Sequence, residues 1–592
     1  MVEIKLSEKD EKAKQLVKDR FNTARDYRRL NYDQSWLRYQ KQYRSRLASE
    51  KEYKFQARLF IPYSFSSVET VIPRVMEAIF SYDPIVAVKP RSAEDIVNSS
   101  LIEKLLNYQI NRMDFINSFH LLTKMCLIYG TCIAKVDWKK EYRKVKRFRA
   151  KIDEFGNPVY DDKGKPVIEK VEQEILYYDD PYIYPIDIFN FYIDPKATSI
   201  DTAEYCIMVT ETTMDRLRQM QKMGIYKNVN MVEEIKGTIR HDDGRERFIN
   251  VDKHDPNNSI DKHSQKVTLY EHWEDDRVIV LAEEQVVIRD EENPYWHCRK
   301  PFVSGIICPV EHQFYGIGLM EMVESLQNEL NDLRNLRMDN LKLAINCMYK
   351  IARDADVDID NLINEPGGVI QTNYVDGIEA LETKDVTTNA FTEAKIITDD
   401  IQTTHGIYDY SKGRPSQDRE TATGILSLQE AANYRFKLMI LLLCKNILGR
   451  GSEFMVDLNE QFINTDKIFK LTGEQYTVTQ YDVEDIIGRF DFEPVGASLE
   501  GLSKYARLEQ LLRYRQIFAG NPEFNQTAFD KELMKLLHFL NPDQFFRQMI
   551  PQNMMGQMSG QNPMQSMLNQ SGQMSGQTNG QMQGQMNLPV AQ

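Results

Sequence analysis

Three stretches near the N-terminus repeat apolar side chains at every third or fourth position, a spacing that predicts helices. In the second stretch, the hydroxyl group of Ser64 can cap the start of the helix. Asp83 precedes Pro84 and should end that helix, because a residue before proline resists the helical conformation. The predicted helices cover residues 8–50, 64–82 and 96–128.

After Gly130, apolar residues alternate with polar ones, which is the period of a β-strand. Cys132–Trp138 shows this alternation, and Gly156–Pro158 and Asp161–Gly164 supply turns between short extended pieces. A polar insertion at His241–His263 interrupts the block and is expected to be mobile. Further strands are predicted at residues 174–178, 189–193, 205–209, 267–273 and 278–287.

A long amphipathic helix is predicted from Gly318 onward. Its apolar residues advance by three or four positions and so form one face, while polar and mostly acidic residues dominate the others. The apolar face comprises Val323, Leu326, Leu330, Leu333 and Leu336. The polar face comprises Glu321, Glu324, Asn328, Asp332, Asn335 and Asp339.

The remaining chain alternates between helices and short mixed segments. A compact stretch broken at Pro366–Gly368 leads to a predicted helix at 390–405, a polar loop at 411–421 and a third long helix at 421–462. Strands are then expected at residues 469–471, 476–479 and 490–492, followed by helices at 498–519 and 526–548.

Beyond Pro551 the composition collapses to Gln, Met, Gly, Ser and Asn. Such a tail cannot bury enough apolar area to offset its chain entropy, so it is expected to be disordered. Two alternatives stay open: its methionines bind a partner, or the tail orders only in an assembled particle.

The totals limit the class of protein. A chain of 592 residues suggests three or four structural units. A formal net charge of −14 has the wrong sign for gripping nucleic acid through many phosphate contacts. Seven scattered cysteines without a CxxC pair suggest reduced thiols. We expect no signal peptide and no membrane span, because the most apolar run, Leu438–Cys444, is too short.

Motifs for catalysis are missing from the sequence. It contains no GxxxxGK[ST] loop, HExxH or GxSxG, so we expect no enzyme and no cofactor. The best metal candidate is the polar insertion, but its spacings match no zinc pattern and a solvent loop is favoured. A metal-dependent nuclease or hydrolase using it stays open as an alternative. The candidate ligands are His241, Asp242, His254, Asp255, His263 and His272.

Five stretches, in order, carry a resemblance to a known family. They are Trp36 with Tyr43; Tyr129–Trp138; Pro185–Phe189 with Asp194–Ala197; Tyr315–Leu319 with Gln327, Asn331, Asn335 and Asp339; and Thr404–Asp409 with Gly413 and Glu420–Thr423. Together they resemble the portal proteins of tailed bacteriophages, most of all the podovirus-type group, over about residues 30–520.

This resemblance implies a mixed α+β portal fold with an α/β wing, a helical stem, a small α/β clip, a helical crown and a disordered C-terminal tail, assembled as a ring. The corresponding ranges are 1–314 (wing), 315–346 (stem helix), 347–388 (clip), 389–408 (stem helix), 409–422 (tunnel loop), 423–497 (long wing helix and wing strands), 498–550 (crown) and 551–592 (tail).

The resemblance also implies partners and a location. Portals form rings, normally of twelve subunits, at one capsid vertex of the virion, and they are assembled in the host cytoplasm. They pass double-stranded DNA and dock the terminase large subunit and a head–tail adaptor beside the major capsid and scaffolding proteins. In the tunnel loop, Lys412, Arg414 and Arg419 are expected to touch DNA phosphates. Another phage connector or tail component stays open as an alternative.

Overall fold

The computed structural model describes most of the chain up to residue 463 and parts of the remainder. The described residues are 7–46, 56–81, 84–92, 95–150, 168–236, 266–346, 348–357, 371–381, 387–407, 436–463, 490–494, 504–518, 520–521 and 524–536. Several predicted features therefore lie outside the described residues: the turns at 156–158 and 161–164, the polar insertion at 241–263, the break at 366–368, the loop at 409–422, the strands at 469–471 and 476–479, and the tail after Pro551. The chain divides into two compact units, residues 1–499 and 500–592.

The N-terminal helical stretch ends at Tyr43, short of the predicted residue 50. Ser7 caps its start by accepting a hydrogen bond from the backbone N–H of Asp10. In the middle, Arg28 is buried and donates hydrogen bonds to two backbone carbonyls of the β-rich part, so a π-helical turn here is fixed by tertiary contacts. The segments are α1 (Glu8–Arg28), the π-helical turn η1 (Arg29–Asp33) and α2 (Gln34–Tyr43).

The next helices depart from prediction in two details. Ser64 does not cap its helix, which starts one residue earlier; its side chain is buried and bonded to Gln42 and Gln327 instead. The predicted helix at 96–128 is two helices, because Asp114 adopts a left-handed conformation with φ 55°. The elements are α3 (Tyr63–Phe80), α4 (Ile96–Arg112) and α5 (Phe115–Tyr129).

Two antiparallel sheets form the β-rich part. The three-stranded sheet has the order β3-β2-β9, with β2 (Thr131–Ala150), β3 (Ile168–Ile186) and β9 (Phe302–Ile306). The five-stranded sheet runs β4-β5-β6-β7-β8, with β4 (Phe191–Ile193), β5 (Cys206–Thr213), β6 (Lys266–Trp273), β7 (Arg277–Ala282) and β8 (Val286–Glu292). The predicted strand at 278–287 is thus two strands joined by a turn. Short helices lie at η2 (Ile188–Asn190), α6 (Met214–Lys222) and α7 (Val229–Lys236).

A buried ion pair joins the two sheets. Lys135 of β2 donates to Glu271 of β6 at 2.8 Å, and its ammonium lies 5.1 Å from the Trp273 ring centre. Burial opposes the charge of Lys135, but the carboxylates of Glu271 and Asp137 outweigh it and hold the pKa of Lys135 above its ordinary value. The hydroxyl of Tyr295 donates to Asp137, so the same network fixes the loop before β9.

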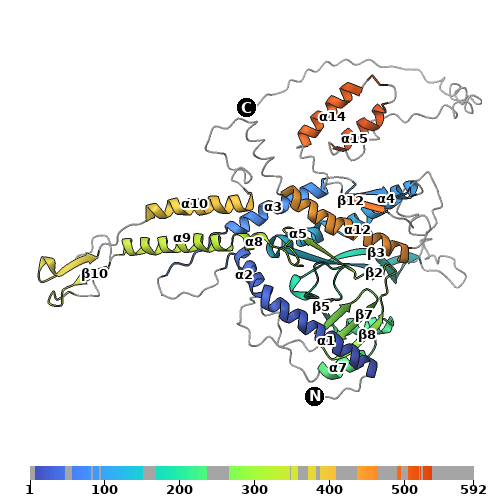
Figure 1. The fold of residues 1–592 in the computed structure, drawn as a ribbon, viewed down its shortest axis with the longest axis horizontal. Helices are drawn as coiled ribbons and strands as arrows, with labels where there is room; N and C mark the ends of the chain where they lie inside the picture. Colours follow the sequence, from blue (N-terminus) through green and yellow to red (C-terminus); the bar gives the residue numbers. More distant parts are fainter. Residues whose placement is uncertain are drawn as a thin grey trace, which may run out of the picture. The chain divides into compact units, whose positions relative to one another are not determined.

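The predicted long helix begins with a short turn, α8 (Leu319–Met322), and continues as α9 (Glu324–Ile345). α9 packs side by side with α10 (Thr387–His405), and the two-stranded sheet of β10 (Met348–Ile351) and β11 (Ile378–Leu381) lies beyond them (Figure 1). A 3₁₀ turn, η5 (Val375–Gly377), precedes β11. We call α9, β10, β11 and α10 the hairpin.

Residues 436–462 are helical and belong to the main hydrophobic core. A second π-helical turn, η7 (Cys444–Gly449), precedes α12 (Arg450–Phe462). The strand β12 (Phe490–Pro494) confirms the strand expected at 490–492, and it pairs with β1 (Val86–Pro90). In the second unit, α14 (Lys504–Phe518) and α15 (Gln526–Leu536) are described. Among the described helices, none combines the length and the apolar character that crossing a bilayer requires.

Candidate functional site: the helical hairpin and its anchorage

An apolar seam holds the two helices of the hairpin together. Val323, Leu330, Ile397 and Ile401 are buried against one another, with Leu326 and Leu333 packed around them. This confirms most of the predicted apolar face, since its residues advance by three or four positions. Leu336, the last predicted member, does not join the seam: its side chain is 68% exposed.

The six residues of the predicted polar face separate into three environments. Glu324 pairs with Arg38 of α2 at 2.6 Å, whereas Glu321, Asn328 and Asp332 are exposed. Asn335 and Asp339 bind the backbone of an extended segment at residues 56–62, which we call the strap. The basic residues predicted to touch DNA, Lys412, Arg414 and Arg419, lie outside the described residues.

Four polar side chains on α9 bind the strap in a regular ladder. The N–H groups of Ala57, Leu59, Ile61 and Ser64 donate to side-chain oxygens of Asp339, Asn335, Asn331 and Gln327 at 2.6, 2.6, 2.9 and 3.1 Å, respectively. Two of these side chains also donate hydrogen bonds to the strap. The amide nitrogen of Asn335 donates to the carbonyl of Leu59, and that of Gln327 donates to the carbonyl of Ile61. Gln327, Asn331, Asn335 and Asp339 are called the ladder below. Their four-residue spacing places them on one side of the helix, and this spacing is the signal in the sequence for the surface that binds the strap.

Three glycines allow the chain to enter the hairpin through a close backbone crossing. Gly130 ends α5 with φ 85°, and a Cβ atom there would lie 2.0 Å from the carbonyl oxygen of Gly316. A Cβ on Gly316 would lie 2.6 Å from the carbonyl oxygen of Cys308, and one on Gly318 would lie 2.6 Å from that of Ile128. Only glycine fits at these positions, so the crossing fixes where α8 and α9 start.

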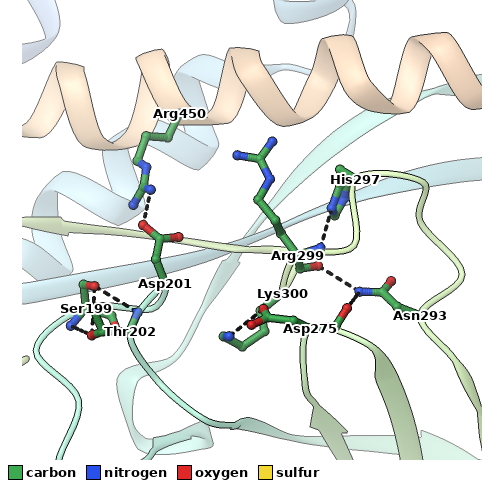
Figure 2. Close-up of polar contacts among 9 residues, drawn as sticks. All are labelled: Ser199, Asp201, Thr202, Asp275, Asn293, His297, Arg299, Lys300 and Arg450. Carbon is green, nitrogen blue, oxygen red and sulfur yellow. Dashed lines mark hydrogen bonds and ion pairs between the residues drawn. The ribbon is translucent and has the colours of Figure 1, made fainter.

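A polar junction connects α12 to the β-rich part. Figure 2 shows Arg450 reaching from α12 to Asp201 and shows Arg299 extending toward the same helix. Arg299 pairs with Asp457 and lies 3.6 Å from Glu453, both on α12. Three ion pairs thus tie the helix to two different loops, one at 194–203 and one at 293–301.

The loop at 293–301 is itself held by polar contacts, one of which comes from a buried lysine (Figure 2). Lys300 is almost fully buried and donates to Asp275 at 2.7 Å. The side-chain nitrogen of Asn293 donates to the carbonyls of Asp275 and Arg299 at 2.9 and 3.1 Å. His297 accepts from the N–H of Arg299, and burial lowers the pKa of His297 to about 4, so it is neutral at neutral pH.

The seam, the ladder and the polar junction anchor helices through apolar and charged contacts. No catalytic geometry occurs in the described part of the chain. No group of three or more His, Cys, Asp or Glu side chains that could hold a metal occurs among the described residues. Of the candidate metal ligands, only His272 is described. It is buried on β6 beside Arg20, and burial, followed by the charges of Arg20 and Arg277, lowers its pKa to about 3. Burial also raises the pKa of the Cys126 and Cys206 thiols, which makes them inert packing groups.

One comparison with known proteins assigns a family to this fold. The family model described as phage SU10 portal protein matches residues 14–587. The match spans the helices, both sheets, the hairpin and α12, and it gives no support to a metal-dependent nuclease or hydrolase.

Proposed function

The chain belongs to the phage SU10 portal protein family, and from this premise we propose that twelve copies close into a ring around a channel for double-stranded DNA. As a phage portal protein it is a structural component of the virion capsid. The proposed ring stands at one vertex, takes in DNA driven by the terminase, and later joins a head–tail adaptor for ejection.

The observation that carries the ring proposal is the apolar surface that the hairpin leaves uncovered. After the seam between α9 and α10 has formed, large apolar side chains remain exposed on both helices, and burial of such side chains against a neighbouring copy would favour association. The residues and their exposed fractions are Leu336 68%, Leu343 46%, Ile345 59%, Phe391 60% and Ile396 48%. A closed ring repeats one heterologous contact around its axis, which would cover this surface with a neighbouring copy.

The proposed assignment of elements to the stem, clip, wing and crown follows the ranges expected from the resemblance. The hairpin corresponds to the two stem helices and the clip, the β-rich part and α12 to the wing, and α14 with α15 to the crown. Major capsid and scaffolding proteins are proposed to surround the wing. The polar junction at Arg299 and Arg450 then fixes the helix that follows the tunnel loop to the body of the wing.

Electrostatics supports passive sliding of DNA. With a formal charge of −14 per chain, a ring of twelve carries 12 × −14 = −168, so its overall field repels phosphates. Against this background, Lys412, Arg414 and Arg419 are proposed to make brief phosphate contacts in the tunnel loop.

Electron microscopy of the purified full-length chain tests the ring. Turbine-shaped particles with a central hole are expected, and monomers or fibres would refute the proposal. Leu343→Glu should break the rings into smaller species, because it places a charge in the proposed contact. Met223→Glu introduces the same charge at a residue that is 56% exposed outside the hairpin, and it should leave the rings intact.

Neutralising the tunnel loop tests its role in DNA handling. The triple variant Lys412→Gln, Arg414→Gln and Arg419→Gln should form normal rings but change DNA packaging or retention. A control with the same change of charge replaces Lys9, Lys12 and Lys14 of α1 by glutamine. Unchanged packaging in the loop variant, or an equal change in the control, would remove the loop from the mechanism.

A further inference from the structure

The ladder recognises backbone rather than side chains. Each described rung joins a polar side chain of α9 to a main-chain N–H of the strap or of the first turn of α3. Asn335 accepts a hydrogen bond from the N–H of Leu59 and donates one to its C=O, as a residue of a neighbouring strand would. The polar side of α9 therefore acts on the strap as the edge of a sheet.

A helix can bind successive N–H groups of an extended chain because the two repeats have nearly the same length. Two residues of extended chain advance about 6.6 Å, and four residues of α-helix advance about 6.0 Å. The strap uses every second N–H, at residues 57, 59 and 61, while the helix uses every fourth side chain, at 339, 335 and 331. The two chains run in opposite directions and stay nearly in step over three rungs.

The ladder changes character along its length. At the α3 end, Gln327, Asn331 and Ser64 are buried, and Gln42 donates a further hydrogen bond to the Ser64 hydroxyl at 2.8 Å. At the other end, Leu59 is 42% exposed and the Leu59 rung is open to solvent. Ile61 packs beside the apolar seam. The strap is thus fixed at Ser64 and most open at the Leu59 rung, whereas the Ala57 and Ile61 rungs are both partly buried.

We propose that residues 56–61 form a releasable clasp on α9, hinged at Ser64 and opening first at the solvent-exposed Leu59 rung. Opening the outer rungs exchanges hydrogen bonds to polar side chains for hydrogen bonds to water, so it exposes little apolar surface. The apolar seam with α10 does not need to break. The closed clasp ties α9 to the start of α3, and the open clasp leaves other contacts of the hairpin in place, including Glu324 with Arg38 and Gln402 with Tyr63.

Hydrogen exchange of the full-length assembled protein tests the clasp through the backbone amides themselves. If the clasp opens at its exposed rung, the Leu59 amide should be less protected than those of Ala57 and Ile61. Asn335→Ala should speed exchange at Leu59 by roughly fivefold, the effect of removing one net hydrogen bond, and leave Ile61 unchanged.

Two further variants complete the test. Asn328→Ala makes the same substitution on the exposed side of α9 and should change no strap amide. Asp339→Asn keeps a side-chain oxygen and should preserve protection at Ala57, whereas Asp339→Ala should abolish it. The clasp is refuted if Asn335→Ala leaves Leu59 unchanged, or if all three amides exchange at one common rate, since the strap would then open only with the surrounding fold.

Discussion

Alanine at Gly130 is expected to destabilise the first unit through two separable effects. A non-glycine residue in the left-handed region costs about 1–2 kcal/mol, and Gly130 has φ 85°. The added Cβ would also lie 2.0 Å from the Gly316 carbonyl oxygen and 2.7 Å from the Ile317 carbonyl carbon. Displacing packed backbone costs about 1–3 kcal/mol, so the total for Gly130→Ala is about 2–5 kcal/mol.

Two other glycines isolate the two effects. Gly224 has φ 78° and nothing within 4 Å of an added Cβ, so Gly224→Ala should cost only about 1–2 kcal/mol. Gly318 has φ −95°, which any residue tolerates, but its Cβ would lie 2.6 Å from the Ile128 carbonyl oxygen. Gly318→Ala therefore measures the steric effect alone, at about 1–3 kcal/mol.

Tryptophan fluorescence during guanidinium denaturation is the appropriate assay, because every tryptophan lies in the first unit. They are Trp36, Trp138, Trp273 and Trp296. The midpoint should fall furthest for Gly130→Ala. If Gly130→Ala and Gly224→Ala lower the midpoint equally, the backbone crossing has no steric role and the reasoning fails.

Three buried polar groups give further predictions. Lys135→Met should lower the free energy of unfolding by about 3–5 kcal/mol, because it leaves Glu271 buried without its partner; adding Glu271→Gln should recover much of this loss in the same denaturation assay, and no recovery would argue against the ion pair. Because the pKa of His272 is lowered to about 3 in the fold, its stabilising effect is complete above the unfolded value near 6.5 and is lost as pH falls toward 3, at up to about 1.4 kcal/mol per pH unit. His272→Gln should therefore flatten the dependence of the denaturation midpoint on pH below 6.5, and an unchanged slope would contradict the assignment. Gln109 and Asn459 exchange hydrogen bonds of 2.8 and 2.9 Å, so Gln109→Ala should cost about 1–3 kcal/mol by leaving Asn459 unsatisfied, and a midpoint unchanged from wild type would show that water replaces the partner.

Hydrophobic periodicity predicted the helices and strands well because most of them bury one side in a common core. It succeeded for the seam of α9 and for β6, where local pattern and tertiary packing agree. It joined α4 to α5 because the left-handed residue Asp114 leaves no mark on the apolar spacing. It also placed Leu336 in the seam, although α10 does not cover that position.

The polar contacts were less predictable because their partners are distant in sequence. Ser64 has the chemistry of an N-cap, but its hydroxyl bonds to other side chains instead. It accepts a hydrogen bond from Gln42 and donates one to Gln327, and all three side chains are buried. Asn335 and Asp339 were grouped with the polar face of a helix, which is correct, but a helical pattern alone does not reveal an extended strap nearly 280 residues earlier in the chain. Family resemblance supplied the portal assignment, and the match over residues 14–587 confirmed it.

The ladder also determines which positions of the strap and of α9 can vary among related proteins. Because α9 contacts the strap through main-chain groups, the side chains of Ala57, Leu59 and Ile61 are not what the rungs recognise. Ala57 and Leu59 should accept most residues among relatives, except proline, which has no N–H to donate. Ile61 is further restricted to apolar residues by its packing beside the seam. The ladder positions on α9 should instead retain a side-chain oxygen. Selection on this contact therefore acts on the ladder residues of α9, whereas the side chains of Ala57 and Leu59 in the strap can change.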